Sequence, residues 1–120
     1  MGKLSEEQQE FTWHIGQLIM FANSQGMKLT FGDAFRSNEE QLRLYNAKKS
    51  QIKSGGNHSK RLAVDFNLFI NGQLTWEWDH YKVLGDYWEQ LDDKNRWGGD
   101  WNKNNIKDGF IDSPHFERNI

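Results

Sequence analysis

The run Leu62–Ile70, followed directly by Asn71-Gly72, constrains the fold more than any other part of the chain. Along most of this run, large apolar side chains alternate with small or polar ones, which is the period of a β-strand with one buried face. Asn-Gly strongly favours a two-residue hairpin turn, so we expect the chain to return through Gln73–Trp78. Asp65 would lie on the face opposite the most apolar side chains. The sequence therefore predicts an antiparallel sheet.

Helical patterns precede and follow this hairpin. Ser5 and the acidic and amide residues after it form a capping-box pattern, and apolar residues then recur at helical spacing, which predicts a helix over Ser5–Ser24. Ser37 can cap a second helix, and the apolar period of a third begins near Asp79. Three segments are expected to be extended or irregular: a strand over Lys28–Phe35, a loop over Lys48–Asn57, and a last strand or loop over Phe110–Phe116.

Aromatic residues must supply much of the core. The 120 residues include six Trp, eight Phe and three Tyr, and these large side chains compensate for few aliphatic ones at a mean hydropathy of -0.92. A chain of this length buries roughly two-thirds of its unfolded surface and fits one ordinary domain. We therefore expect a single α+β domain over residues 1–120, with a small antiparallel sheet and about three helices.

Charge and cysteine content exclude several classes of protein. Fifteen basic residues against seventeen acidic ones leave a net charge of -2, so no nucleic-acid partner is expected. The absence of cysteine excludes disulfides, and any metal must bind through His, Asp or Glu. No apolar stretch approaches the roughly twenty residues that cross a bilayer, so no membrane insertion is expected. The first residues lack the pattern of a secretory signal.

Two of the four histidines lie close to acidic residues in the sequence. His58 precedes Asp65 by seven residues, and Asp112 precedes His115 by three. Two imidazoles and a carboxylate are a common zinc set that leaves a fourth position for water, and a second carboxylate can supply a base. Spacing alone leaves the alternative open, because a single His–Asp pair is more often a surface hydrogen bond than a metal site.

The residues around each remaining candidate predict where it lies in the fold. Pro114 favours an extended backbone at the residue before it, so Asp112 and His115 are expected on a strand or loop. The other two histidines have simpler explanations than metal binding. His14 is assigned to the surface of the first helix or to partial packing against it. His80 is assigned to the start of the third helix, with metal binding as the less favoured alternative.

Four motif-like segments follow one another along the chain: Phe35-Arg36-Ser37 with Gln41, Asn57–Asp65, Arg96–Gly99 and Asp112–His115. In this order they resemble the Y-R-S-x-x-x-Q, H-x-x-G-x-A-x-D, W-G-G and acidic-x-x-His motifs of the M15 family of zinc peptidases, the D-Ala-D-Ala carboxypeptidase and L-alanyl-D-glutamate endopeptidase group. The resemblance covers most of the chain. It departs from the pattern at two positions: Arg61 stands where the signature has glycine, and Gly56 where it often has serine.

The resemblance implies a DD-peptidase and hedgehog-like fold and a role for each motif residue. Zn²⁺ would be held by His58, Asp65 and His115. Asp112 would be the catalytic base, taking a proton from a water that the zinc activates. Arg36 would stabilise the polarised carbonyl or anchor a substrate carboxylate. The further substrate-binding residues are Ser37, Gln41 and Trp97, with core packing as the equal alternative for Trp97.

The same resemblance implies the function. It indicates a zinc-dependent peptidase that hydrolyses a bond of the peptidoglycan stem peptide, with an L-alanyl-D-glutamate endopeptidase of the phage endolysin type favoured. A D-Ala-D-Ala carboxypeptidase and a non-catalytic cell-wall-binding module remain alternatives. We expect a monomer that is made in the cytoplasm without a signal peptide and acts at the cell wall or periplasm after release.

Overall fold

The fold consists of a long helix, a strand, a β-hairpin, a second helix and two further strands. A computed structural model describes residues 3–32, 60–104, 106–107, 109 and 111–120. Among these residues the helices are α1 (Lys3–Ser24) and α3 (Trp78–Leu91). The strands are β1 (Met27–Phe31), β2 (Ala63–Ile70), β3 (Gln73–Thr75), β4 (Asn95–Trp97) and β5 (His115–Arg118).

Strand β2 is the centre of an antiparallel sheet, as the sequence predicts. The strand order is β1-β2-β5-β4, and β3 pairs with β2 as well. The predicted hairpin is confirmed, because Asn71 and Gly72 have φ angles of 53° and 77°, the positive values that a type I′ turn requires. The return strand ends at Thr75, however, and Trp78 begins α3 instead of ending that strand.

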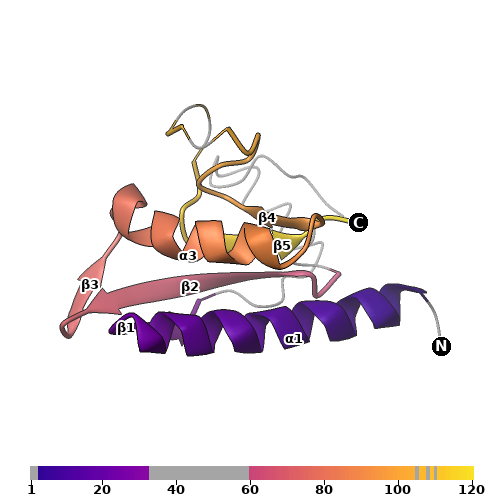
Figure 1. The fold of residues 1–120 in the computed structure, drawn as a ribbon, viewed down its shortest axis with the longest axis horizontal. Helices are drawn as coiled ribbons and strands as arrows, with labels where there is room; N and C mark the ends of the chain where they lie inside the picture. The colour runs from indigo at the N-terminus through magenta and orange to yellow at the C-terminus, as the bar shows by residue number, and fades with distance from the viewer. Residues whose placement is uncertain (1–2, 33–59, 105, 108, 110) are drawn as a thin grey trace.

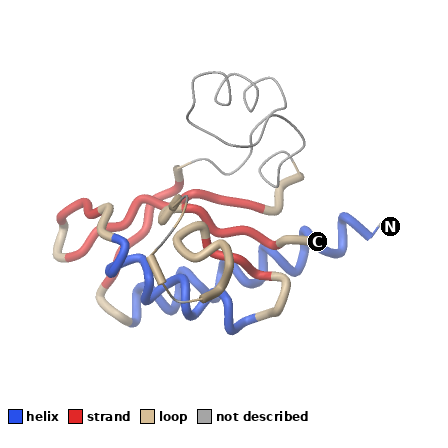
Figure 2. Tube along the Cα trace, turned by 90° about the horizontal axis from the view of Figure 1, so that it is seen from above, coloured by secondary structure: helices blue, strands red, loops and turns tan. Residues whose placement is uncertain are grey.

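Both described helices lie on one side of the sheet (Figures 1 and 2). The first predicted helix is confirmed, with a start at Lys3 instead of Ser5, and Gly26 follows its end at a φ of 78° that favours glycine. The helix predicted to begin near Asp79 begins at Trp78. Neither α1 nor α3 combines the length and the apolar character needed to cross a bilayer.

Aromatic side chains fill the space between the helices and the sheet. Trp88 of α3 meets Phe11 of α1 and Phe116 of β5 edge to face, at ring-centroid distances of 5.7 and 6.1 Å. The Tyr81 hydroxyl donates to the carbonyl of Phe66 at 2.7 Å, so this buried polar group is satisfied. The core comprises Phe11, Ile15, Leu18, Ala22, Leu62, Val64, Phe66, Leu68, Tyr81, Leu84, Trp88, Trp97 and Phe116.

Several sequence predictions fall outside the described residues or differ from the structure. The helix expected from Ser37 and the loop expected over Lys48–Asn57 lie outside the description, so two helices are described against about three expected. Of the strand expected over Lys28–Phe35, the described part ends at Phe31. The last strand covers His115–Arg118 instead of Phe110–Phe116, because it is residues 115–117 that pair with β2.

Glu7 joins α1 to the end of the sheet through buried charges. Its carboxylate accepts hydrogen bonds from Lys94 Nζ at 2.6 Å and from Arg118 Nε at 2.7 Å. Arg118 also lies 3.3 Å from the carboxylate of Asp92. The hydrogen bonds from Lys94 and Arg118 hold the pKa of Glu7 below its ordinary value of 4.5. Loss of the Glu7 charge would remove a partner from a buried guanidinium.

Glu7→Gln is expected to lower the midpoint of thermal unfolding at pH 7. Because the folded-state pKa of Glu7 is depressed, its charge stabilises the fold fully above about pH 4.5 and progressively less as the pH falls through the folded value. The difference between wild type and variant should therefore shrink on acidification. Thermal unfolding followed by circular dichroism at pH 7 and pH 3 measures it. The exposed neighbour variant Glu6→Gln is the control, and an equal effect from it would contradict the assignment.

Gly85→Ala is expected to destabilise the fold by about 1–3 kcal/mol, because an added Cβ would overlap the indole of Trp97 in a packed core. Gly16→Ala in α1 is the matched control, since nothing lies within 4 Å of a Cβ there. It should stabilise the protein by about 0.5–1 kcal/mol through helix propensity alone. Urea unfolding of both variants checks the pair, and opposite signs are required.

Candidate metal centre

Antiparallel pairing of β2 with β5 brings Asp65 next to His115. The two residues are register partners although fifty positions separate them in the sequence. The N–H of Phe66 donates to the carbonyl of Pro114 at 3.0 Å and helps to fix this register. Directly opposed residues of such a pair project to one face of the sheet. Val64 and Phe66 belong to the core, so the intervening Asp65 projects to the other face, as the sequence predicts.

Asp112 reaches the same place through the turn that leads into β5. Its N–H donates to the carbonyl of Gly98 at 2.8 Å, and its own carbonyl accepts from the N–H of His115 at 3.0 Å. The prediction that Asp112 and His115 lie on a strand or loop is confirmed. This turn therefore fixes the positions of the Asp112 and His115 side chains relative to the sheet.

The side chains of Asp65, Asp112 and His115 converge. One ligand atom from each lies within 4.8 Å of the others. Nδ1 of His115 is 3.2 Å from Oδ1 of Asp65 and 4.0 Å from Oδ2 of Asp112. The imidazole is buried, whereas 39% of the Asp112 side chain is exposed. The cluster thus has a fixed buried side and a carboxylate that solvent can reach.

These groups fit a divalent cation such as zinc. An imidazole nitrogen and carboxylate oxygens are ordinary zinc ligands, and two ligands of a tetrahedral zinc lie about 3.4 Å apart. The separation of 3.2 Å between His115 and Asp65 is close to that value. Asp112, at 4.0 Å, is better placed beside an ion than as a second ligand next to His115.

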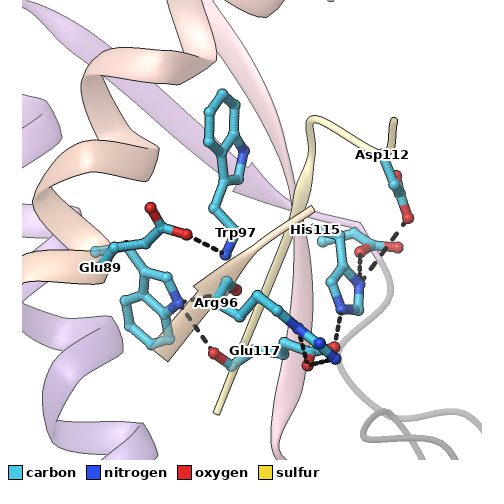
Figure 3. Close-up of polar contacts among 8 residues, drawn as sticks. Glu89, Arg96, Trp97, Asp112, His115 and Glu117 are labelled. Carbon is cyan, nitrogen blue, oxygen red and sulfur yellow. Dashed lines mark hydrogen bonds and ion pairs between the residues drawn. The ribbon is translucent and has the colours of Figure 1, made fainter. Parts of the chain in front are cut away.

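The other nitrogen of His115 is held by a residue that sequence reasoning did not identify. Nε2 lies 2.8 Å from Oε1 of Glu117, and Oε2 of Glu117 accepts from Nε and Nη2 of Arg96 at 3.0 and 2.7 Å. Figure 3 shows this continuous series of contacts from Arg96 through Glu117 to His115 and on to Asp112. In the sequence, the alternation of side chains along a β-strand could have pointed to Glu117, because it places residues 115 and 117 on the same face of the sheet.

The electrostatics of the cluster follow from these contacts. Burial alone would lower the pKa of His115, but the hydrogen bonds and charges of Asp65 and Glu117 outweigh burial and raise the pKa to about 9. Burial likewise opposes ionisation of Glu117, yet His115 and Arg96 hold the pKa of Glu117 below its ordinary value. Glu117 is therefore an ionised carboxylate in the interior.

Trp97 and Gly98 form the base on which the Asp112 turn rests. Trp97 is 1% exposed, and its indole N–H donates to the carbonyl of Ser113 at 2.7 Å. A Cβ at Gly98 would overlap the carbonyl oxygen of Asp112, so this contact requires glycine. Of the two interpretations left open for Trp97, its burial agrees with core packing, and contact with substrate stays a prediction.

Trp101 lies over the same cluster. Its ring is 5.1 Å from that of His115, and the Arg96 guanidinium is 4.9 Å from the Trp101 ring. The second distance is that of a cation–π contact between Arg96 and Trp101.

The remaining predicted site residues lie outside the described part of the chain. They are Arg36, Ser37, Gln41 and His58, and their roles stay predictions. Arg61 is described and has a φ of 57°, in the left-handed region that favours glycine. Glycine adopts this conformation most readily, and Arg61 adopts it with a side chain.

The two histidines assigned to other roles lie away from the cluster. His14 is buried against Trp88, with ring centroids 6.2 Å apart. His80 Nδ1 lies 2.8 Å from the hydroxyl of Thr75, at the start of α3. The structure accounts for both through local packing and hydrogen bonding.

Comparison with known proteins adds a family and a fold. The family described as phage L-alanyl-D-glutamate peptidase matches residues 25–118, which include the whole cluster. The L-Ala D-Glu endopeptidase ChiX of Serratia marcescens has 27% sequence identity and a TM-score of 0.58, over 77% of this chain and 67% of its own. A search of curated proteins gave no match.

Two further solved structures share the fold at lower identity. A mutant of the vancomycin resistance D,D-pentapeptidase VanY from a VanB-type resistance cassette, in complex with Zn(II), has 16% identity and a TM-score of 0.58, over 91% of this chain and 70% of its own. VanYB in complex with D-alanine-D-alanine has 17% identity and a TM-score of 0.57, over 91% and 69%. The predicted DD-peptidase-like α+β fold is confirmed.

Proposed function

The chain belongs to the family of phage L-alanyl-D-glutamate peptidases, and on this premise we propose that it is a zinc-dependent enzyme that cuts the L-alanyl-D-glutamate bond of peptidoglycan stem peptides. The observation that carries the proposal is the convergence of Asp65, Asp112 and His115. These three residues combine the nitrogen and oxygen ligands of a catalytic zinc with a carboxylate that solvent reaches.

Asp65 and His115 are the proposed ligands supplied by the described residues. Their 3.2 Å separation suits two neighbouring positions on a tetrahedral ion, and Nδ1 of His115 faces both carboxylates. His58 is the proposed third ligand, on the strength of the motif it shares with Asp65. The choice of zinc rests on the imidazole nitrogen and carboxylate oxygens that the cluster offers.

Asp112 is the proposed general base. Zinc, when bound, lowers the pKa of a water and polarises the peptide carbonyl. Asp112 lies beside the proposed ligands and is reached by solvent, so its carboxylate can take the proton of the attacking water and return it to the leaving amine. Arg36 is proposed to stabilise the developing negative charge or to anchor a substrate carboxylate.

The choice of bond rests on the family and on ChiX. Both are described by the L-alanyl-D-glutamate linkage, whereas the VanY structures, at 16% and 17% identity, support the fold alone. We further propose that the protein acts as a monomer at the cell wall after release from the cytoplasm, as expected of a phage endolysin.

Digestion of purified sacculi tests the proposed bond. The expected products are stem peptides with a new D-glutamate amino terminus, identified by mass spectrometry, and a zinc chelator should stop their release until zinc is restored. Free D-alanine as the sole product would identify a carboxypeptidase instead. Binding to sacculi without any product would identify a wall-binding module.

Asp112→Asn is expected to lower the rate of hydrolysis by a factor on the order of 10²–10⁴ while zinc still binds, because the base is lost and the ligands remain. Asp65→Asn is the matched variant, and it should lose both zinc and activity. Zinc content by atomic absorption, measured beside the rate, separates the two. An Asp112→Asn protein with the wild-type rate would show that another group is the base.

A further inference from the structure

We propose that Glu117 is a positioning residue for the metal centre, which fixes the His115 imidazole so that Nδ1 faces the ion. This inference rests on the proposed function, because it assigns Glu117 a role toward the zinc that Asp65 and His115 would hold. Glu117 is 1% exposed, and it lies two residues from His115 on the same strand. Oε1 of its carboxylate contacts Nε2 of His115, so Glu117 acts on the metal centre through His115.

Imidazole chemistry gives Glu117 this role. A histidine that binds a cation through one nitrogen carries its proton on the other, and the partner of that proton sets which nitrogen is free. Oε1 of Glu117, at 2.8 Å from Nε2, is such a partner. With zinc bound, the contact with Glu117 would keep a proton on Nε2 and leave the lone pair of Nδ1 for the ion.

The two oxygens of Glu117 have separate partners. Oε1 contacts His115, while Oε2 accepts both hydrogen bonds from Arg96. A carboxylate buried to this extent would be costly without a compensating charge, and the guanidinium supplies it. Arg96 in turn lies against Trp101, which restricts its movement. The acceptor for His115 is therefore held on its far side by a second rigid contact.

The backbone around Glu117 fixes its position as firmly as the side chains do. Glu117 is the register partner of Ala63 on β2 and of Arg96 on β4, so β5 is paired on both edges at this residue. A contact supplied by a strand with two neighbours is more exact than one supplied by a loop. The pairing of β5 with β2 and β4 thus fixes the position of Glu117, and through it the orientation of the His115 ring.

A purely structural role for Glu117 gives a different expectation. If Glu117 serves only to join β5 to β4 through its ion pair with Arg96, removal of either partner should have the same effect. If Glu117 orients His115, changes at Glu117 should weaken metal binding more than changes at Arg96. The pair therefore provides its own control.

The experiment measures zinc affinity of the metal-depleted protein by competition with a chelating dye, together with urea unfolding and the visible spectrum of the cobalt(II)-substituted protein. Glu117→Leu should bind zinc roughly 10–100-fold more weakly and alter the cobalt spectrum. Arg96→Gln, which keeps a donor for Glu117 but removes the charge, should lose clearly less zinc affinity than Glu117→Leu. Glu117→Gln keeps the volume and one oxygen acceptor, so it remains informative even if the leucine variant does not fold. It should lose roughly threefold to tenfold, since a neutral acceptor makes the weaker hydrogen bond.

The outcomes separate the two proposals. Wild-type affinity in Glu117→Gln or Glu117→Leu, or an equal loss in Arg96→Gln, would overturn the positioning role while leaving the proposed function intact. Failure of the wild-type protein to bind zinc at all would overturn both. A greater loss of zinc affinity in the Glu117 variants than in Arg96→Gln, with the cobalt spectrum changed, would establish the positioning role.

Discussion

The register between β2 and β5 is the constraint on which the rest of the structure depends. It places Asp65 opposite His115 on one face of the sheet and Val64 opposite Phe116 on the other, where they enter the core. Because successive residues of a strand alternate between faces, a shift of one residue would bury the site residues among Leu and Trp and expose the core. The same pairing therefore decides both packing and chemistry.

Strand β5 transmits this constraint to both layers of the molecule. His115 belongs to the candidate metal centre, where it contacts Asp65, and Glu117 contacts His115. On the helix side, Arg118 donates to Glu7 of α1. All four residues of the strand are buried, three of them polar or charged. Such a strand is stable only because each of these groups has a partner on an adjacent element. The amino-terminal helix and the cluster are thus connected through one short segment.

Sequence reasoning succeeded where a local pattern determines the structure. The Asn71-Gly72 turn, the apolar period of α1 and the pairing of Asp112 with His115 are all set by neighbours a few residues apart. The family resemblance also brought together the distant residues Asp65 and His115, which the structure places in one cluster, but neither pattern nor resemblance identified Glu117. In the sequence Glu117 resembles any polar residue of a strand. Only its contacts with Arg96 and His115 in the folded protein reveal its role. The limits of the last strand were likewise set by its pairing with β2, which the tail sequence does not reveal.

The distance in sequence between Asp65 and His115 has a consequence for biosynthesis. The two halves of the cluster come from strands that meet only when β5 inserts between β2 and β4. Closing so long a loop is entropically costly and belongs to late steps of folding. A nascent polypeptide therefore cannot assemble these ligands before β5 has been synthesised, and a translation product truncated before β5 would lack His115 altogether.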